Sequence, residues 1–402
     1  MKRDGENVII YKTYESLTPK TKMAKEWKAV LILLAVLFFL LVYFFWVRKD
    51  MTDFSVCYQG GKRIGKGETL YRISDGHLQY KYSPASAVFF ALLALLPEEA
   101  AKLIWYFVQI FLFYLSLHLS YELLPQKWRK KGTTLLLTFL VMLKFFAREV
   151  ELGQVNILII FLFVITFISL LKEKEAEAGI SLGFSLFFKP YALVFLPYLL
   201  LKKKLKVILA GTGMIVLGFF LPMAFYGFKG NIAIFREWQE SLSVSTMALL
   251  KSYDNASLHA FFLKIFPPQT SRLVWLWILV WATVIGFSFL WMTARGRRNK
   301  LKKPEILEYS FLLVLIPLFS PLGWYYNYLY SFLAVIVLLN LLGKFPAGLR
   351  FFLITNFIII GASLMEVMGK PAFHFYTGYS LVVINYLIIL FFLLYSRKRE
   401  LS

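Results

Sequence analysis

The 402-residue sequence predicts an all-α polytopic membrane protein, with roughly 11 to 13 transmembrane or half-membrane helices and a large first outer loop. Hydrophobic residues make up 59% of the chain and aromatic residues 18%, an apolar share that an ordinary soluble domain could not bury. Several apolar runs are also about as long as the ~20 residues that cross a ~30 Å hydrocarbon core. They lie at residues 30–47, 103–124, 274–292 and 381–395.

The formal net charge of +22 indicates membrane topology, not a nucleic-acid partner. Lys and Arg residues punctuate the apolar runs instead of collecting on one folded face. The positive-inside rule places such clusters in the cytoplasm. The clusters lie at residues 20–28, 127–131, 202–206, 295–303 and 397–399. Cys57 is the only cysteine, so the chain can form no intrachain disulfide and no cysteine-based zinc site.

One order of membrane crossings places all of these clusters, and both termini, in the cytoplasm. The first span follows a basic stretch and is too long for a signal-peptide core. We expect spans at residues 29–47, 101–124, 133–150, 155–171, 207–226, 272–293, 306–322, 325–342, 351–368 and 379–396. The predicted organisation is a cytoplasmic tail over residues 1–28, a single transmembrane domain over residues 29–396 and a second cytoplasmic tail over residues 397–402.

Residues 178–201 form a segment of 24 residues between two basic cytoplasmic groups, so a single crossing would place one group outside. We interpret it as two half-helices of about 11 residues, each reaching ~17 Å, with Lys189-Pro190 at the apex. A lysine at that depth must face protein or water, not lipid.

Two long outer loops complete this order of crossings, at residues 48–100 and 227–271. The first is rich in Gly, Tyr and charge, and it contains a short apolar piece, residues 83–97, that is too short to span and is expected along the outer surface. The second mixes charge with aromatic residues. Loops of this length usually carry function.

Ionisable and amide side chains collect at the outer ends of the predicted helices, whereas the cytoplasmic side offers only short basic linkers. Carboxylates there can act as a general base or bind a metal, and cations can hold a lipid phosphate. Lys189 and the turn at residues 148–156 stand out, because charge between apolar helices is costly. The candidates are Asp50, Asp53, Lys62, Arg63, Arg72, Tyr80, Tyr82, Arg148, Glu149, Glu151, Gln154, Asn156, Lys189, Asp254, Asn255 and His259.

Short motifs follow one another along these outer segments. They are DFSVCY at 53–58, GETLY at 67–71, YKYSP at 80–84, LLALLP at 92–97, GQVN at 153–156, GISLG at 179–183 with Lys189-Pro190, NASL at 255–258 and SPLGW at 320–324. In this order, over about residues 29–330, the sequence resembles glycosyltransferase family 87, whose members are polyprenol-phosphate-mannose-dependent mannosyltransferases. The resemblance implies the C-type membrane glycosyltransferase architecture, with residues 29–396 as the catalytic domain.

The resemblance also implies a mechanism, with Asp53 in the position of the catalytic base. Asp53 would deprotonate an acceptor hydroxyl, which displaces polyprenyl phosphate from the sugar with inversion. Lys189 and Arg148 are expected to bind the leaving phosphate. The pKa of Asp53 is expected to be lowered by its basic neighbours in the sequence. These neighbours are Arg48, Lys49, Lys62 and Arg63.

Other motif residues are expected to contact the substrates. Gln154 and Asn156 suit sugar hydroxyls, with helix capping and interhelical hydrogen bonds as the alternative. The remaining substrate-binding candidates are Tyr82, Asn255 and Trp324. No cofactor is required with certainty, and a divalent metal is an option for which Asp50 would be a ligand.

The expected partners are a polyprenyl-phosphate sugar carrying mannose or another hexose, a glycan or lipid-linked acceptor, and membrane lipid. The expected location is the cell membrane, plasma or inner, with the active site on the outer face. One departure from the family lies at residues 325–328, Tyr-Tyr-Asn-Tyr, which lack a histidine and suit either a different acceptor or an interfacial anchor.

A polytopic transporter or lipid flippase is the alternative function. It should show internal repeats and several charges near the bilayer midplane, and the sequence has neither. A non-catalytic membrane scaffold would not explain the ionisable and amide side chains at the outer ends of the predicted helices.

Overall fold

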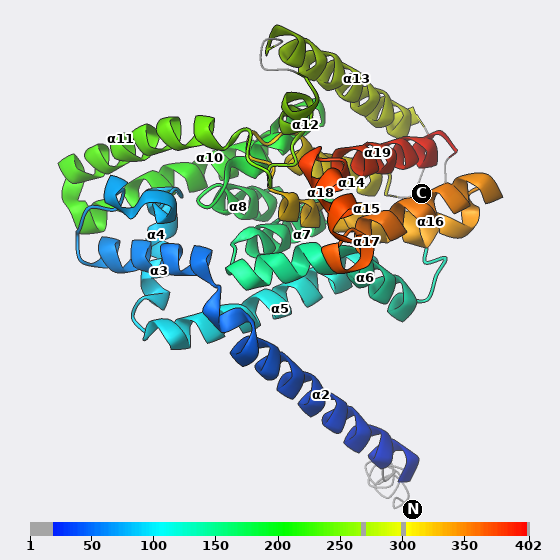
Figure 1. Cartoon of the computed structure of the whole chain (residues 1–402), viewed down its shortest axis with the longest axis horizontal. Coiled ribbons are helices and arrows are strands. Elements are labelled where there is room, and N and C mark those ends of the chain that lie inside the picture. The colour runs from blue at the N-terminus through cyan, green and yellow to red at the C-terminus, as the bar shows by residue number, and fades with distance from the viewer. Residues whose placement is uncertain (1–18, 267–270, 299–302, 400–402) are drawn as a thin grey trace, which may run out of the picture. The chain divides into compact units, whose positions relative to one another are not determined.

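In the computed structural model, the described residues are 19–266, 271–298 and 303–399. Their regular structure is helical, and extended pairing within this part of the chain is an isolated bridge between Asn255 and Trp324 (Figure 1). Contacts divide the chain into two units, Met1–Asp50 and Met51–Ser402. The all-α prediction is confirmed.

The first unit contains the predicted first span. Helix α2 covers Pro19–Phe45 and the short 3-10 helix η1 covers Val47–Lys49. Apolar side chains such as Leu33 and Phe38 are exposed along α2. Exposure of this kind is expected of a helix whose solvent is lipid.

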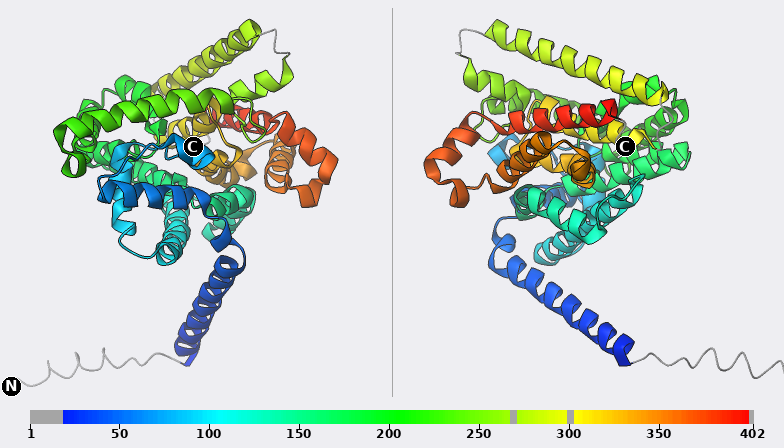
Figure 2. Two further views of the ribbon diagram at one scale, coloured as in Figure 1. Left: turned by 60° about the vertical axis from the view of Figure 1, so that its left-hand side comes forward. Right: turned by 90° about the vertical axis from the view of Figure 1, so that its right-hand side faces the viewer.

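Three described helical segments of the second unit are long and apolar enough to cross a membrane, and up to five if each of two bent pairs forms one span. The three are α5 (Glu98–Leu123), Arg272–Arg295 within α13 (Ser271–Arg298), and Tyr325–Lys344. Their burial differs: in the most apolar 18-residue stretch of each segment, 89% is buried in Tyr325–Lys344 and 17% in the α13 segment. The former therefore lies in the core, whereas α13 lies at an edge beside α12 (Figure 2).

The core around the Tyr325–Lys344 segment is built from apolar helices. This segment comprises η5 (Tyr325–Ser331) and α15 (Phe332–Leu341), and every residue of α15 is buried. Helices α6 (Lys131–Leu152) and α14 (Glu305–Phe319) pack against α15. Helix α7 (Asn156–Leu171) packs against α5. The runs of Leu, Ile, Val and Phe that predicted these spans thus face other helices, not only lipid.

The predicted break at Lys189 is confirmed. Helix α8 (Glu175–Ser185) ends before it, and Lys189 is extended, with φ −145° and ψ 148°. The chain then continues as the 3-10 helix η3 (Pro190–Phe195) and α9 (Leu196–Leu201). Proline cannot donate a backbone hydrogen bond, and its ring disfavours helical conformation in the residue before it, so Pro190 marks this boundary.

Helix α10 (Leu205–Phe220) packs tightly on α8 through glycines of the GISLG motif. A Cβ atom built on Gly179 would lie 2.4 Å from the carbonyl oxygen of Val207, and one on Gly183 would lie 2.6 Å from that of Gly211. Small residues allow such close backbone approach between membrane helices. This packing fixes the first arm of the hairpin that carries Lys189.

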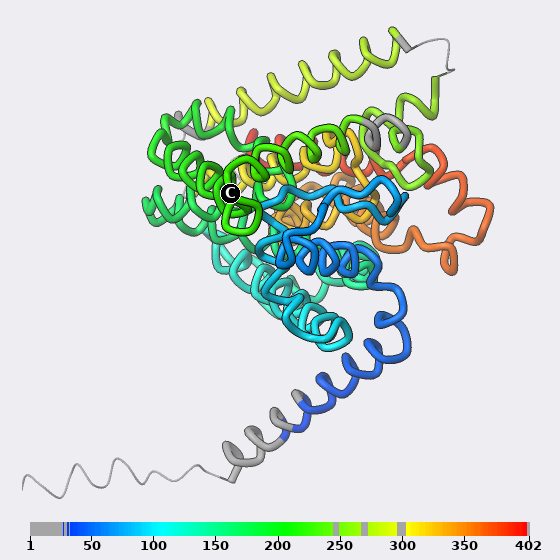
Figure 3. The backbone as a smooth tube through the Cα atoms, turned by 90° about the vertical axis from the view of Figure 1, so that its left-hand side faces the viewer, coloured from blue at the N-terminus to red at the C-terminus, as the bar shows by residue number. Residues whose placement is uncertain are grey.

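The two loops that were predicted to be outer are more helical than the sequence suggests. The first contains α3 (Thr52–Gly65), the 3-10 helix η2 (Ile73–Leu78) and α4 (Pro84–Leu93), of which only the apolar piece at α4 was expected. In the second, α11 (Met223–Leu249) bends away from α10 by 94°. Helix α4 packs on α3 and also contacts α10 and α11 (Figure 3).

The remaining described helices surround the core on other sides. Helix α12 covers Leu258–Ile265, and α16 covers Ala347–Ala362. Helix α16 begins and ends before the predicted span at 351–368, because the chain turns at Ser363. The short helices α17 (Met365–Met368) and α18 (Lys370–Gly378) follow, and α18 meets α19 (Val382–Lys398) at an angle of 66°.

Candidate active site

The turn between α6 and α7 carries the centre of the candidate site. Gly153 caps α6 with a left-handed φ of 68°, and a Cβ atom there would lie only 2.6 Å from Cβ of Phe54 on α3. Glycine therefore satisfies two requirements here, the positive φ and the close approach. The indole of Trp105 donates to the Gly153 carbonyl oxygen at 2.9 Å. These contacts hold the next residue, Gln154, against the first turn of α3.

The side chain of Gln154 connects the predicted base to the predicted cation. Its amide nitrogen Nε2 donates to Oδ2 of Asp53 at 2.5 Å and to the Tyr326 hydroxyl at 3.3 Å. Its oxygen Oε1 accepts from Lys189 Nζ at 3.1 Å and from the Tyr82 hydroxyl at 3.2 Å. Four elements distant in sequence therefore meet at one buried amide.

Asn156, at the start of α7, forms a second set of hydrogen bonds that also includes Lys189. Its oxygen Oδ1 accepts from Lys189 Nζ at 2.8 Å and from the Tyr330 hydroxyl at 3.0 Å. Its nitrogen Nδ2 donates to Glu149 Oε1 at 2.6 Å and to Asn327 Oδ1 at 3.0 Å. Glu149 is fully buried, and its Oε2 has no hydrogen-bond partner among the described residues. Lys189 is thus held between two amide oxygens.

Aromatic rings complete the surroundings of Lys189. Its Nζ lies 5.9 Å from the ring centre of Tyr82 and 5.6 Å from that of Tyr191, within the range of cation–π attraction. The Tyr191 hydroxyl accepts from Asn327 Nδ2 at 3.0 Å. Within the described part of the chain, the hydrogen-bond partners of Lys189 are amide oxygens and not carboxylates. Its ammonium group is therefore held by neutral oxygens, while its charge acts through space on Asp53 and Glu149.

Among the residues of η5, sequence reasoning missed Tyr330 and left the role of Tyr326 and Asn327 open between acceptor binding and an interfacial anchor. In the structure, all three residues contact Gln154 or Asn156. The available signal was Asn327, an amide just before a fully apolar run, because such a residue must find partners inside the protein.

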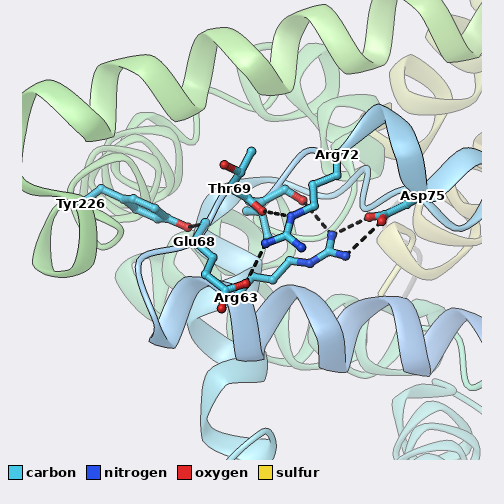
Figure 4. Close-up of polar contacts among 7 residues, drawn as sticks. Arg63, Glu68, Thr69, Arg72, Asp75 and Tyr226 are labelled. Carbon is cyan, nitrogen blue, oxygen red and sulfur yellow. Dashed lines mark hydrogen bonds and ion pairs between the residues drawn. The ribbon is translucent and has the colours of Figure 1, made fainter.

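The loop between α3 and α4 is fixed by charged contacts before it reaches Tyr82 (Figure 4). Arg63 binds Asp75 through two hydrogen bonds of 2.5 and 3.0 Å, and Arg72 binds Glu68 at 2.7 Å. The Tyr226 hydroxyl on α11 donates to the Glu68 carbonyl oxygen at 2.6 Å. Bidentate arginine–carboxylate pairs add geometric specificity, so this loop is well ordered.

Two further hydrogen bonds fix the end of the same loop. The Trp238 indole on α11 donates to the Lys81 carbonyl oxygen at 3.0 Å, and the Tyr71 hydroxyl donates to that of Tyr82 at 2.7 Å. The backbone on both sides of the Tyr82 side chain is therefore held in place. Helix α11 positions a residue of the site without contributing to it directly.

The electrostatics of Asp53 correct one expectation. Burial raises the pKa of Asp53 above its ordinary value, and the hydrogen bond from Gln154 only partly opposes this rise. The cations that also oppose it are Lys189, Arg148 and Lys81. The expected lowering by Arg48, Lys49, Lys62 and Arg63 was wrong, since Arg63 pairs with Asp75 and desolvation dominates.

The other predicted residues lie around this cluster. Arg148 pairs with Glu151 at 2.7 Å and acts on Asp53 only through its charge. The Asn255 side chain is buried and bonds main-chain groups of Leu250, Pro321 and Ser257. It thereby supports the bridge to Trp324, two residues before Tyr326, and its contact with substrate stays a prediction.

Metal binding also stays a prediction. Asp50 belongs to the first unit, and its role as a metal ligand is untested. Among the residues that the structure describes, no group of three His, Cys, Asp or Glu side chains is arranged to hold a metal ion.

Comparison with protein families identifies the chain's relatives. The family model described as glycosyltransferase family 87 matches residues 80–321 of the chain. The matched range contains Tyr82, Arg148, Gln154, Asn156 and Lys189, whereas Asp53 precedes it. Comparisons with curated proteins and with solved structures found no match.

Proposed function

The chain belongs to glycosyltransferase family 87, and on this premise we propose that it transfers a hexose from a polyprenyl-phosphate donor to a hydroxyl acceptor. Its apolar helices make it a multi-pass membrane protein. Mannose or another hexose is the proposed sugar, and a glycan or a lipid-linked molecule is the proposed acceptor. The alternative of a transporter or lipid flippase is set aside, because the family consists of glycosyltransferases.

We further propose the cell membrane as the location, with the termini in the cytoplasm and the cluster around Gln154 on the outer face. The basic segments that precede α6 and follow α9 support this orientation, because Lys and Arg resist translocation. The cluster lies at the opposite end of α6 from its basic segment, which supports the proposed outer location.

The observation that carries the mechanism is the Gln154 amide between Asp53 and Lys189. Glycosyl transfer with inversion needs a base on the attacking hydroxyl and a cation at the leaving phosphate, on opposite sides of the anomeric carbon. Asp53 supplies the carboxylate and Lys189 the cation, and the amide fixes their separation. Arg148, at the edge of the cluster, is the second proposed phosphate ligand.

In the proposed reaction, the acceptor oxygen forms a bond to the anomeric carbon as its proton passes to Asp53. The bond from that carbon to the phosphate oxygen breaks, and the electron pair leaves with polyprenyl phosphate. Lys189 stabilises the charge that develops there. Tyr82, Gln154 and Asn156 are proposed to contact sugar hydroxyls, in exchange for some of the hydrogen bonds that they form with one another.

The first experiment replaces the base. Asp53→Asn keeps the shape of the side chain and removes the proton acceptor, so turnover should fall by about 10²–10⁴-fold, the usual contribution of general-base catalysis. Purified protein in lipid vesicles, supplied with radiolabelled polyprenyl-phosphate hexoses and membrane acceptors, would measure this loss. Glu366→Gln is the control, because Glu366 is an exposed carboxylate of α17 outside the cluster.

The Asp53→Asn protein should remain folded. An ionised Asp53 destabilises the folded state at pH values above its raised pKa, so the neutral amide should leave the melting temperature at pH 7 unchanged or higher. Near-normal transfer by Asp53→Asn would exclude Asp53 as the base. If the natural protein used nucleotide sugars and no polyprenyl-phosphate sugar, the proposed donor class would be wrong.

A further inference from the structure

An apolar groove lies along α6 and α16, away from the cluster around Gln154. It has a volume of about 630 Å³ and also includes the end of α15. Its walls are formed by aliphatic and aromatic side chains, among them Leu140, Ile354 and Ile358, and its charged lining residues are Arg129 and Arg350. Leu140 and Ile358 are at least half exposed, so the groove opens sideways to the lipid phase.

Both arginines lie at the same end of the groove. Arg129 is two residues before the start of α6, and Arg350 is in the first turn of α16. Each helix presents its N-terminus there, and the partial positive charge of a helix N-terminus favours an anion. Lys344 adds a third cation at this end, where its Nζ lies 3.4 Å from the ring centre of Trp128.

The segment that carries Arg129 is fixed to the core. The backbone N–H groups of Trp128 and Arg129 donate to Oδ1 of Asn340 at 2.9 and 3.3 Å. Asn340 is buried, and its Nδ2 donates to the Gln126 carbonyl oxygen at 2.8 Å. Arg350 is oriented by hydrogen bonds from its Nη2 to the carbonyl oxygens of Gly343 and Phe345, at 3.3 and 3.1 Å. The two guanidinium groups are therefore carried on ordered backbone.

The length of the groove matches one leaflet. Its lining residues on α16 run from Arg350 to Ala362, which corresponds to about 18 Å at 1.5 Å per residue. Half of a ~30 Å hydrocarbon core is of similar depth. A ligand with one anionic end and one apolar tail of leaflet length complements both the charge and the shape of this groove.

We propose that the groove binds one anionic phospholipid, with its phosphate at Arg129 and Arg350 and an acyl chain along α16. The far end of the groove, at Gly361 and Ala362, adjoins Ser363, whose side chain and carbonyl oxygen both accept from Lys144 of α6. A bound lipid thus fills the space between α16 and α6. Because α6 ends at Gly153, the lipid also supports the helix that presents Gln154.

Native mass spectrometry and thermal melts of the full-length protein in detergent test this proposal without an activity assay. Phosphatidylglycerol should raise the melting temperature of the natural protein by several degrees, and one lipid per chain should remain bound. Arg129→Gln/Arg350→Gln should weaken binding about tenfold or more, as expected for the loss of charged hydrogen bonds. Ile358→Trp should fill the groove and abolish the shift.

The controls are matched to these changes. Lys174→Gln removes an exposed cation elsewhere, and Phe351→Trp enlarges a 73% exposed residue of α16 that does not line the groove. Both should keep the full shift. Equal shifts with phosphatidylglycerol and phosphatidylcholine, or a full shift in both groove variants, would overturn the proposal. Because neither readout uses sugar transfer, failure here would be distinct from failure of the proposed function.

Discussion

At the scale of single residues, the orientation of the Gln154 amide is determined by its neighbours. Its oxygen receives two donors, Lys189 and Tyr82, and its nitrogen donates to a carboxylate. The opposite orientation would bring N–H groups against the lysine ammonium and two oxygens against each other. The fixed dipole of this amide therefore couples Asp53 to Lys189. Gln154→Glu would replace the hydrogen bond to Asp53 with repulsion between two carboxylates.

The pH dependence of transfer follows from the pKa of Asp53, which burial raises. A general base works when ionised, so kcat/KM should fall as pH drops through this raised pKa, at higher pH than for an ordinary aspartate. Lys81 opposes the rise through its charge. Lys81→Gln should therefore shift the acid limb to still higher pH. The measurement is a pH profile of kcat/KM.

Lys62→Gln serves as the control for this profile, because Lys62 is an exposed cation of α3 that does not contribute to the pKa of Asp53. Its acid limb should coincide with that of the natural protein. An acid limb that stays in place in Lys81→Gln would show that another group governs the profile.

Residue types predicted the residues of the site between helices where polar groups interrupt apolar sequence. Gln154, Asn156 and Lys189 could be found in this way, since each lies between apolar helices and needs internal partners. Tyr326 and Tyr330 could not, because tyrosine is equally common at membrane interfaces. The direction of the Asp53 pKa shift also required the fold, since desolvation depends on residues distant in sequence.

At the scale of helices, the sequence predicts best where charge bounds an apolar run. Helices α5, α6 and α7 begin and end within a few residues of the predicted spans. The hairpin at Lys189 followed from the length of its segment and the basic groups at both of its ends. Helix α3 was not predicted, because its composition is mixed and Gly60 and Gly61 argue against a helix. Those glycines are explained by packing: a Cβ atom on Gly61 would lie 2.4 Å from the backbone of Phe90 on α4.

The contact between α6 and α3 gives a prediction at the same scale. Gly153→Ala places a side chain at φ 68° and against Phe54, so the free energy of unfolding should fall by about 1–3 kcal/mol. The transfer rate of the protein that remains folded should fall as well, because Gln154 moves away from Asp53. Thermal melts and transfer rates on the same preparation would separate the two effects.

Gly132→Ala is the matched control on α6, because a Cβ atom there has no neighbour within 4 Å. Its stability should stay within about 1 kcal/mol of the natural protein. If Gly153→Ala behaved in the same way as Gly132→Ala, the close approach of α6 to α3 would not be required for activity.

At the scale of the whole molecule, the proposed topology can be tested through accessibility. Cys57 is buried, so a cysteine introduced elsewhere is the group that an impermeant maleimide reaches first. Asp254→Cys should be labelled in intact cells, whereas Lys174→Cys should be labelled only after permeabilisation, because basic segments stay in the cytoplasm. Labelling of Lys174→Cys in intact cells would reverse the proposed orientation.

Because α11 bends away from α10 by 94°, the thickness of the surrounding bilayer affects the geometry of the site. If α10 crosses the membrane, α11 lies along its surface, and Tyr226 and Trp238 hold the Tyr82 loop from there. Helix α10 has 16 residues and spans only about 24 Å, less than a ~30 Å hydrocarbon core. Such hydrophobic mismatch draws α11 inward or thins the bilayer. Transfer should therefore be fastest in membranes of short-chain lipids and should slow as acyl chains lengthen.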